Sequence, residues 1–183
     1  VYQELDLVPG LGVAEHVFLG HYPRTPRGLV DFAEMRTRTR ALLAELGLAI
    51  DVDLPVGELR VAEQQLVEIA RALSRQARLI VMDEPTSALS PGEVDRLFDV
   101  VRRMQARGVA IVYVSHKLDE IYRIADRVTV FRDGRRVVTE QVPATTPRQL
   151  VAWMVGRDLQ DLYPKTPSTP GPTLLEVHGV SGS

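Results

Sequence analysis

Two adjacent carboxylates, Asp83 and Glu84, follow the apolar run at residues 79–82 and precede Pro85. This order is typical of a buried parallel strand that carries acidic groups to the edge of an α/β sheet. One carboxylate in such a place can serve Mg²⁺, and the next can poise a water molecule against a phosphate. The alternative is a buried strand followed by an ordinary polar turn. That alternative explains the apolar run but not the motifs found elsewhere in the chain.

A histidine ends a second apolar run. Residues 109–114 predict another buried strand, and Ser115 and His116 come directly after it. A lone histidine at a strand end is more often a satisfied structural residue than a functional one. Here the preceding strand and the spacing from Glu84 favour a functional role.

The composition excludes several classes of protein. The 183 residues include 45% apolar residues, enough for one domain with a sizeable core. The net charge of −2 argues against a surface that coats nucleic acid. Disulfides, zinc–thiolate sites and thiol catalysis are excluded because the chain has no cysteine. The sequence begins with Val1 and contains no apolar run near the roughly 18 residues of a transmembrane helix. We therefore expect a cytosolic chain that is cut at its start.

The apolar spacing places the remaining elements. Helical periodicity predicts helices over residues 31–46, 61–76, 91–107, 117–125 and 146–155. Residues 1–5 are predicted to be the end of a strand. Further strands are predicted over residues 78–82, 109–114, 128–131 and 136–140. Ser90, Pro91 and Glu93 form a helix start signal, and Asp133-Gly134 predicts a two-residue hairpin turn. The alternation of strands and helices indicates an α/β fold.

Four motifs occur in a fixed order along the chain. They are Gln3 at the end of the opening strand, the helix start at residues 59–65, the acidic pair with the turn after it, and Ser115-His116. This order resembles the ATP-binding subunit of an ABC transporter, from the Q-loop to the end of one nucleotide-binding domain. The resemblance implies a P-loop NTPase of the RecA-like ABC type, with a parallel sheet core and an α-helical subdomain. In finer detail the chain resembles the tandem ATPases of sugar importers of the ribose, galactose and xylose type.

The resemblance assigns a role to each motif. Asp83 should hold Mg²⁺ through its water shell, and Glu84 should orient or deprotonate the attacking water. His116 should donate a hydrogen bond to the γ-phosphate, and Gln3 should touch Mg²⁺ or the attacking water. The turn that caps the next helix should also serve as the D-loop, which crosses to the partner domain. Its residues are Ser87, Ala88, Leu89 and Ser90.

The segment at the place of the family's Leu-Ser-Gly-Gly-Gln signature departs from that pattern after its first residue. It consists of Leu59, Arg60, Val61, Ala62 and Glu63. The resemblance implies that this helix start binds the phosphates of the nucleotide held by the opposite domain. Arg60 could reach a phosphate as a charge, whereas Glu63 would repel it unless turned away. The alternative is an ordinary amphipathic helix start. Because each signature serves the nucleotide of the opposite domain, this departure puts one of the two composite sites in doubt.

No G-x-x-x-x-G-K-[ST] motif, the Walker A loop that cradles phosphates, occurs in the sequence. The family places this loop upstream of the Q-loop, so we expect the 183-residue chain alone neither to bind ATP tightly nor to hydrolyse it. The resemblance divides the chain into a partial nucleotide-binding domain (1–159), a proline-rich linker (160–173) and the start of a second nucleotide-binding domain (174–183). The first of these would contain the helical subdomain (6–75) and the catalytic sheet with the last hairpin and helix (76–159).

ATP and Mg²⁺ are the cofactors that the resemblance implies, at the cytoplasmic face of the inner membrane. The implied partners are transmembrane permease subunits, a second ATPase domain and, indirectly, a periplasmic or lipid-anchored solute-binding protein, with no nucleic acid. Residues 6–58 would meet the permease. Some of their apolar side chains are candidate permease contacts or core residues, namely Phe18, Leu19, Tyr22 and Leu29.

Three other functions compete with a sugar importer. The nearest is an importer of a nucleoside or another small solute. A soluble ABC ATPase acting on ribosomes or DNA would carry an intact signature and a basic linker or coiled coil, but the linker at 160–173 is almost uncharged. A non-catalytic binding module is disfavoured because Asp83, Glu84 and His116 are all in place.

Overall fold

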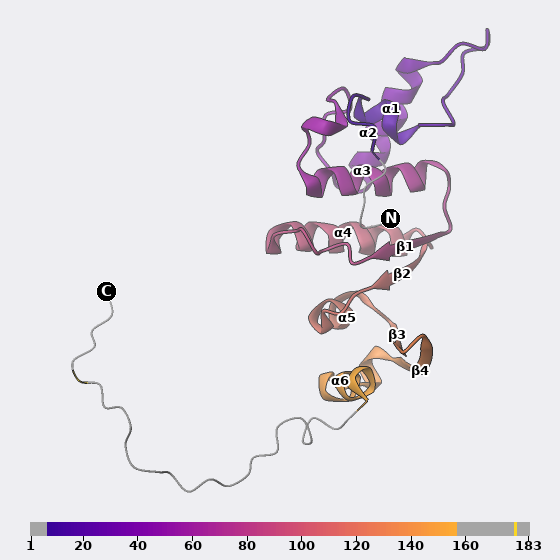
Figure 1. The fold of residues 1–183 in the computed structure, drawn as a ribbon. Coiled ribbons are helices and arrows are strands. Elements are labelled where there is room, and N and C mark those ends of the chain that lie inside the picture. Colours follow the sequence, from indigo (N-terminus) through magenta and orange to yellow (C-terminus); the bar gives the residue numbers. More distant parts are fainter. Residues whose placement is uncertain (1–6, 157–177, 179–183) are drawn as a thin grey trace, which may run out of the picture. The chain divides into compact units, whose positions relative to one another are not determined.

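The computed structural model of the chain describes residues 7–156 and residue 178 (Figure 1). Three predictions lie outside these residues: the strand end at residues 1–5, the linker at 160–173 and the strand from Leu174. The chain divides into two compact units, residues 1–128 and residues 129–183. The division into nucleotide-binding domain, linker and second domain stays a prediction.

Helices dominate the first unit, which also contains a short parallel sheet of two strands (Figure 1). In chain order its described elements are α1 (Val13–Val17), α2 (Phe32–Glu45), a 3₁₀ turn (Val56–Glu58), α3 (Val61–Ser74), β1 (Leu79–Asp83), α4 (Pro91–Ala106), β2 (Ala110–Val114) and α5 (Leu118–Ile124). The predicted helices and strands are confirmed, with ends close to those expected from the sequence. Helix α1 and the 3₁₀ turn were not predicted.

Helix α1 escaped prediction because tertiary contacts fix it. It spans only five residues, too few for a clear apolar periodicity. The Gly12 N–H donates to the Glu15 carboxylate at 2.9 Å, which caps the helix start. The backbone N–H groups of Val13 and Ala14 donate to carbonyl oxygens of the segment at residues 52–54. These partners are distant in sequence, so no local pattern could show them.

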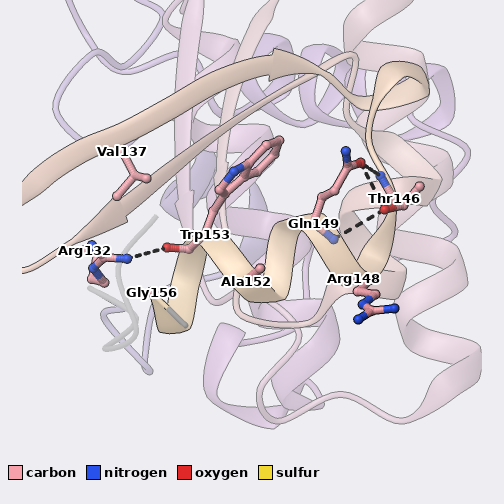
Figure 2. A pocket seen from close by; sticks show the side chains of 8 residues that line it. All are labelled: Arg132, Val137, Thr146, Arg148, Gln149, Ala152, Trp153 and Gly156. Atoms are coloured by element: carbon pink, nitrogen blue, oxygen red, sulfur yellow. Dashed lines mark hydrogen bonds between the residues drawn. The ribbon is translucent and has the colours of Figure 1, made fainter. Parts of the chain in front are cut away.

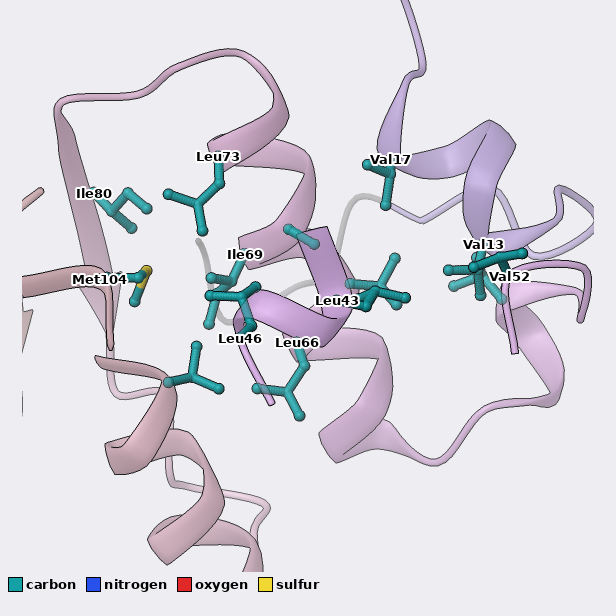
Figure 3. Packing of buried hydrophobic residues seen from close by; sticks show 14 of the residues in the cluster. Val13, Val17, Leu43, Leu46, Val52, Leu66, Ile69, Leu73, Ile80 and Met104 are labelled. Atoms are coloured by element: carbon teal, nitrogen blue, oxygen red, sulfur yellow. The ribbon is translucent and has the colours of Figure 1, made fainter. Parts of the chain in front are cut away.

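One cluster of buried apolar side chains joins α1, α2, α3, β1 and α4. Helix α3 contributes Leu66, Ile69 and Leu73, which share one face at helical spacing (Figure 3). Ile80 of β1 and Met104 of α4 belong to the same cluster. Burial of this continuous apolar surface is the main favourable term in folding the first unit.

Strands β1 and β2 pair in parallel, with Leu79 opposite Ala110 and Asp83 opposite Val114. The prediction that these strands are buried is wrong for one of their two faces. Ile80 and Met82 are 4% and 0% exposed, whereas Leu79 and Val81 are 56% and 47% exposed. On β2, Val112 and Val114 are likewise exposed. An apolar run has no alternation that could reveal a one-sided strand.

The second unit contains an antiparallel hairpin and a helix. Its elements are β3 (Arg127–Arg132), which begins just before the unit, β4 (Arg135–Gln141), a 3₁₀ turn (Val142–Ala144) and α6 (Pro147–Val155). Asp133 and Gly134 both have positive φ, at 53° and 72°. The predicted two-residue hairpin turn is therefore confirmed. Thr146 caps α6, since its side chain accepts a hydrogen bond from the Gln149 N–H.

Of the candidate permease contacts, Phe18 is a core residue with 6% exposure. Leu29 is 68% exposed, which leaves it accessible on the surface of the first unit. Tyr22 is half-buried against the core cluster. The apolar residues of this segment therefore divide between packing and surface.

Candidate functional site

The parallel pairing of β1 and β2 brings the acidic pair and the histidine together. Both strands end at the same edge of the sheet, with Asp83 opposite Val114. The Glu84 N–H extends the ladder by one bond, since it donates to the Val114 carbonyl at 2.9 Å. Glu84 and His116 each follow their strand within two residues, so the backbone itself places them side by side.

The side chains of Glu84 and His116 form a direct contact. His116 Nδ1 lies 2.7 Å from Glu84 Oε1. The carboxylate is 26% exposed and the imidazole 67% exposed, so solvent and solutes reach both groups. An ionised carboxylate only accepts hydrogen bonds, so Nδ1 is the donor. The pair lies at a solvent-accessible place on the sheet edge.

Glu84 has an unusual backbone conformation. Its φ is +44°, in the left-handed region that non-glycine residues rarely adopt. Such a residue costs about 1–3 kcal/mol and persists only where its surroundings fix it. The bond to the Val114 carbonyl on one side and that from the Ser87 N–H to the Glu84 carbonyl, at 3.2 Å, on the other hold it in place.

Asp83 ends β1 with an exposed side chain. Among residues 7–156 and residue 178, no group of three or more His, Asp or Glu side chains could hold a metal ion. Mg²⁺ is commonly bound by one or two carboxylates together with phosphates and water. The donor set here, an accessible carboxylate beside Glu84, fits an ion held in that way and does not fit a metal held by protein groups alone.

The turn after Glu84 is fixed by backbone bonds and by a helix cap. The Leu89 N–H donates to the Thr86 carbonyl at 3.3 Å. The Ser90 N–H and hydroxyl both donate to Glu93 Oε2, at 2.8 and 2.7 Å. These two bonds hold the pKa of the Glu93 carboxyl below its ordinary value. The predicted start of α4 is confirmed, with Glu93 as acceptor. Ser87 and Ala88 at the tip of the turn are exposed.

The segment at residues 59–63 forms the start of α3. The Glu63 carboxylate accepts from the Arg60 N–H at 3.0 Å, so it folds back on its own helix. Val61 is 53% exposed, whereas Ala62 is buried at 9%. Leu59 packs partly against the core, and its carbonyl accepts from the Gln64 side chain at 3.1 Å. The Glu63 carboxylate thus caps the helix start and occupies one of its backbone donors.

The start of α3 and the turn before α4 lie next to each other within the first unit. They line a small hollow of about 30 Å³, enough for about one water molecule. Arg60, Ala62 and Glu63 border it on one side and Leu89 on the other. Two of the predicted binding segments therefore meet. Gln3 lies outside the described residues.

Sequence reasoning missed a buried polar cluster around Glu120. Its members, which the sequence did not single out, are Thr86, Tyr113, Lys117 and Glu120, together with Ser115 of the histidine motif. One signal could have pointed to it. Glu120 lies four residues before Ile124, so the two share one face of α5. A charged residue on a core-facing stripe needs partners.

The second unit contains a hollow of its own, of about 460 Å³ (Figure 2). Arg132 lines this hollow and donates from Nη1 to the Trp153 carbonyl at 3.1 Å. Thr146, Arg148 and Gln149 line it from the start of α6 (Figure 2). None of the predicted site residues belongs to it.

Within the described ranges, no helix combines the length and the apolar character needed to cross a bilayer.

Comparison with known sequences gives consistent matches. The profile of the ABC transporter family matches residues 1–87. The ribose import ATP-binding protein RbsA 2 of Rubrobacter xylanophilus is 50% identical over 179 residues, 97% of this chain and 34% of that protein. The xylose import ATP-binding protein XylG of Burkholderia ambifaria is 47% identical over 182 residues, 99% of this chain and 35% of that protein. The chain thus spans about a third of the length of these curated relatives.

Solved structures show the same fold. The dimeric structure of MJ0796, a bacterial ABC transporter cassette, matches with a TM-score of 0.63 and 26% identity, over 78% of this chain and 61% of that one. The ADP conformation of MJ1267, an ATP-binding cassette of an ABC transporter, matches with a TM-score of 0.67 and 24% identity. The match covers 86% of this chain and 66% of that one. The predicted α/β fold of P-loop type is confirmed for this partial chain.

Proposed function

We propose that this chain, whose residues 1–87 match the profile of the ABC transporter family, forms part of an ATPase that energises the import of a monosaccharide. The contact between Glu84 and His116 carries this proposal. The support for a sugar comes from relatives whose names specify ribose and xylose import. Import of a nucleoside or another small solute by the same kind of ATPase is the alternative.

Glu84 is the proposed general base. Its carboxylate would orient the water that attacks the γ-phosphate and accept its proton. His116 would hold the γ-phosphate through its second ring nitrogen, and its 67% exposed ring supports access to that group. Since Nδ1 already donates to Glu84, Nε2 can donate to a phosphate only in a doubly protonated ring.

Asp83 is the proposed residue for Mg²⁺, with Gln3 as a second contact. The ion, when bound, would neutralise charge on the phosphates. The exposed Asp83 carboxylate at the end of β1 supports this role. Glu84, one residue further, would remain free for the water.

Two segments are proposed to meet a nucleotide held across a domain interface. They are the start of α3, with Leu59, Arg60, Val61, Ala62 and Glu63, and the turn formed by Ser87, Ala88, Leu89 and Ser90. Their meeting at one hollow supports a shared role. The Arg60 N–H ties the Glu63 carboxylate to its own helix, but its charge stays at the helix start, so contact with a phosphate there would fall to Arg60. The opposite ATPase domain would supply that nucleotide, as the dimeric relative suggests by analogy.

Further partners follow from the same proposal. They are transmembrane permease subunits at the cytoplasmic face of the inner membrane and, through them, a solute-binding protein. Hydrolysis would also require a Walker A loop, a motif that the 183 residues do not contain. Nucleic acid is not a proposed partner, given the net charge of −2.

The test is the variant Glu84→Gln in the full-length ATPase, with phosphate release as the assay. Gln cannot accept the water proton, so we expect kcat to fall about 10²- to 10⁴-fold while the KM for ATP is nearly unchanged. Asp99→Asn, on the exposed face of α4, is the matched control and should keep the parental kcat. Parental turnover in the Glu84→Gln protein would refute the assignment of the base. Uptake of labelled ribose, xylose and a nucleoside by reconstituted vesicles then identifies the solute.

A further inference from the structure

A buried carboxylate, Glu120 of α5, joins the two segments that carry Glu84 and His116. It is only 6% exposed. Thr86, two residues after Glu84, donates from its hydroxyl to Glu120 Oε1 at 2.5 Å. Ser115, directly before His116, donates to Oε2 at 3.0 Å. One side chain therefore bonds to a near neighbour of each member of the pair.

Two further side chains complete the cluster. The Tyr113 hydroxyl, from β2, donates to Glu120 Oε2 at 2.8 Å. The Lys117 ammonium lies 3.4 Å from Glu120 Oε1 and donates to the Thr86 carbonyl at 3.3 Å. The Lys117 N–H also donates to the Ser115 hydroxyl at 3.0 Å. His116 thus sits between two residues that are both tied to Glu120.

The cluster is electrostatically consistent with an ionised Glu120. Burial alone would raise the pKa of this carboxyl, but the bonds from Thr86, Tyr113 and Ser115 and the nearby Lys117 charge hold it below its ordinary value. Burial, together with the bond to Glu120 and the charge of that residue, raises the pKa of the Tyr113 hydroxyl, so the phenol stays protonated and donates. A fully bonded network of this kind fixes the geometry of its members.

We propose that Glu120 is a positioning residue that sets the Glu84–His116 geometry by tying Thr86 and Ser115 to one buried carboxylate. The inference rests on the proposed ATPase function, since the pair that Glu120 positions is the proposed catalytic pair. Glu120 itself would not touch the nucleotide. Its effect reaches the reaction through the two backbone segments, where a displacement of about 1 Å can cost about 10²-fold in rate.

The first test compares Glu120→Gln with Asp119→Asn in the full-length ATPase. Both variants replace a carboxylate by an amide on α5, but Asp119 is exposed. Glu120→Gln should lower kcat by about 10²-fold and leave the KM for ATP within about twofold, because the amide places N–H donors against existing donors. Asp119→Asn should leave both constants at the parental value. A parental kcat in the Glu120→Gln protein would overturn the proposal.

A second readout does not depend on hydrolysis. In ¹⁵N-labelled 183-residue chain, the imidazole resonances of His116 report its contact with Glu84. Glu120→Gln should shift or broaden them, and Asp119→Asn should not. Unchanged His116 resonances would overturn the proposal even if the parent hydrolyses ATP. A parent that does not hydrolyse ATP would instead refute the proposed function and leave the spectra to decide the role of Glu120.

A milder variant covers the case in which Glu120→Gln does not fold. Thr86→Val removes one hydroxyl donor and keeps the shape of the side chain. It should reproduce the shift of the His116 resonances and lower kcat in the same direction. Combined with Glu120→Gln in a folded protein, it should add little further loss, because both act through one network. Full additivity, or a Thr86→Val protein with parental spectra, would count against the proposal.

Discussion

The one-sided burial of β1 predicts losses of stability of very different size at two neighbouring residues. Ile80 is 4% exposed and Val81 is 47% exposed, on opposite faces of the same strand. Ile80→Ala removes three buried carbon atoms, about 2.4 kcal/mol by transfer at about 0.8 kcal/mol each. The cavity left among Leu73, Met104 and their neighbours raises the loss of unfolding free energy to about 3–4 kcal/mol.

Val81→Ala removes two carbon atoms that are about half exposed. By the same measure the loss is about 0.8 kcal/mol, without a cavity term. The strand preference lost on replacement by Ala is similar at both positions, so it largely cancels from the difference. Ile80→Ala should therefore be the more destabilising variant by about 2–3 kcal/mol.

Urea unfolding of the 183-residue chain, followed by far-UV circular dichroism, measures both values. Fluorescence would not serve, because the only tryptophan, Trp153, belongs to the second unit. Equal losses for Ile80→Ala and Val81→Ala, at unchanged m-values, would show that the second face of the strand is covered. That result would refute the assignment of one core-facing side to β1.

Two further predictions concern pH and helix capping. Burial would raise the pKa of Glu68, but its bond to His16 and nearby charges lower it overall, so its contribution to stability should disappear as pH falls below about 4.5. Glu68→Gln should flatten that acid limb in urea titrations, and the exposed Glu45→Gln should not. Thr146→Ala removes the α6 cap and should cost about 1 kcal/mol, seen as an earlier Trp153 fluorescence transition. An unchanged transition would contradict the capping role.

Much of the fold could be predicted because its signals are local. The start of α4 carries its own cap in Ser90, Pro91 and Glu93, and the hairpin turn carries Asp133-Gly134. The alternation of strands and helices then limits the topology to a parallel sheet for β1 and β2. These features depend on neighbours in the chain, so the sequence alone suffices to place them.

Features that depend on distant partners could not be predicted. Strand faces were missed because residues 79–82 are apolar throughout, so nothing distinguishes Ile80 from Val81 in the sequence. The Glu120 cluster was missed because its donors are spread from Thr86 to Lys117 and meet only in the folded chain. The Glu84–His116 proximity, by contrast, was expected from the family resemblance, which assigned both residues to one phosphate, although the strand register that produces it is not a local pattern.

The same register has a consequence for how the sequence specifies its fold. Both faces of β1 and β2 are rich in aliphatic residues, so hydrophobicity hardly penalises a slip of one position along the strand. The polar ends of the strands must then select the correct alignment, above all the side-chain contact between Glu84 and His116, because backbone bonds can form in any register. The residues proposed for catalysis would then also help to select the register of the two strands. A substitution of Glu84 or His116 at this edge would therefore disturb both the alignment of the strands and the proposed turnover.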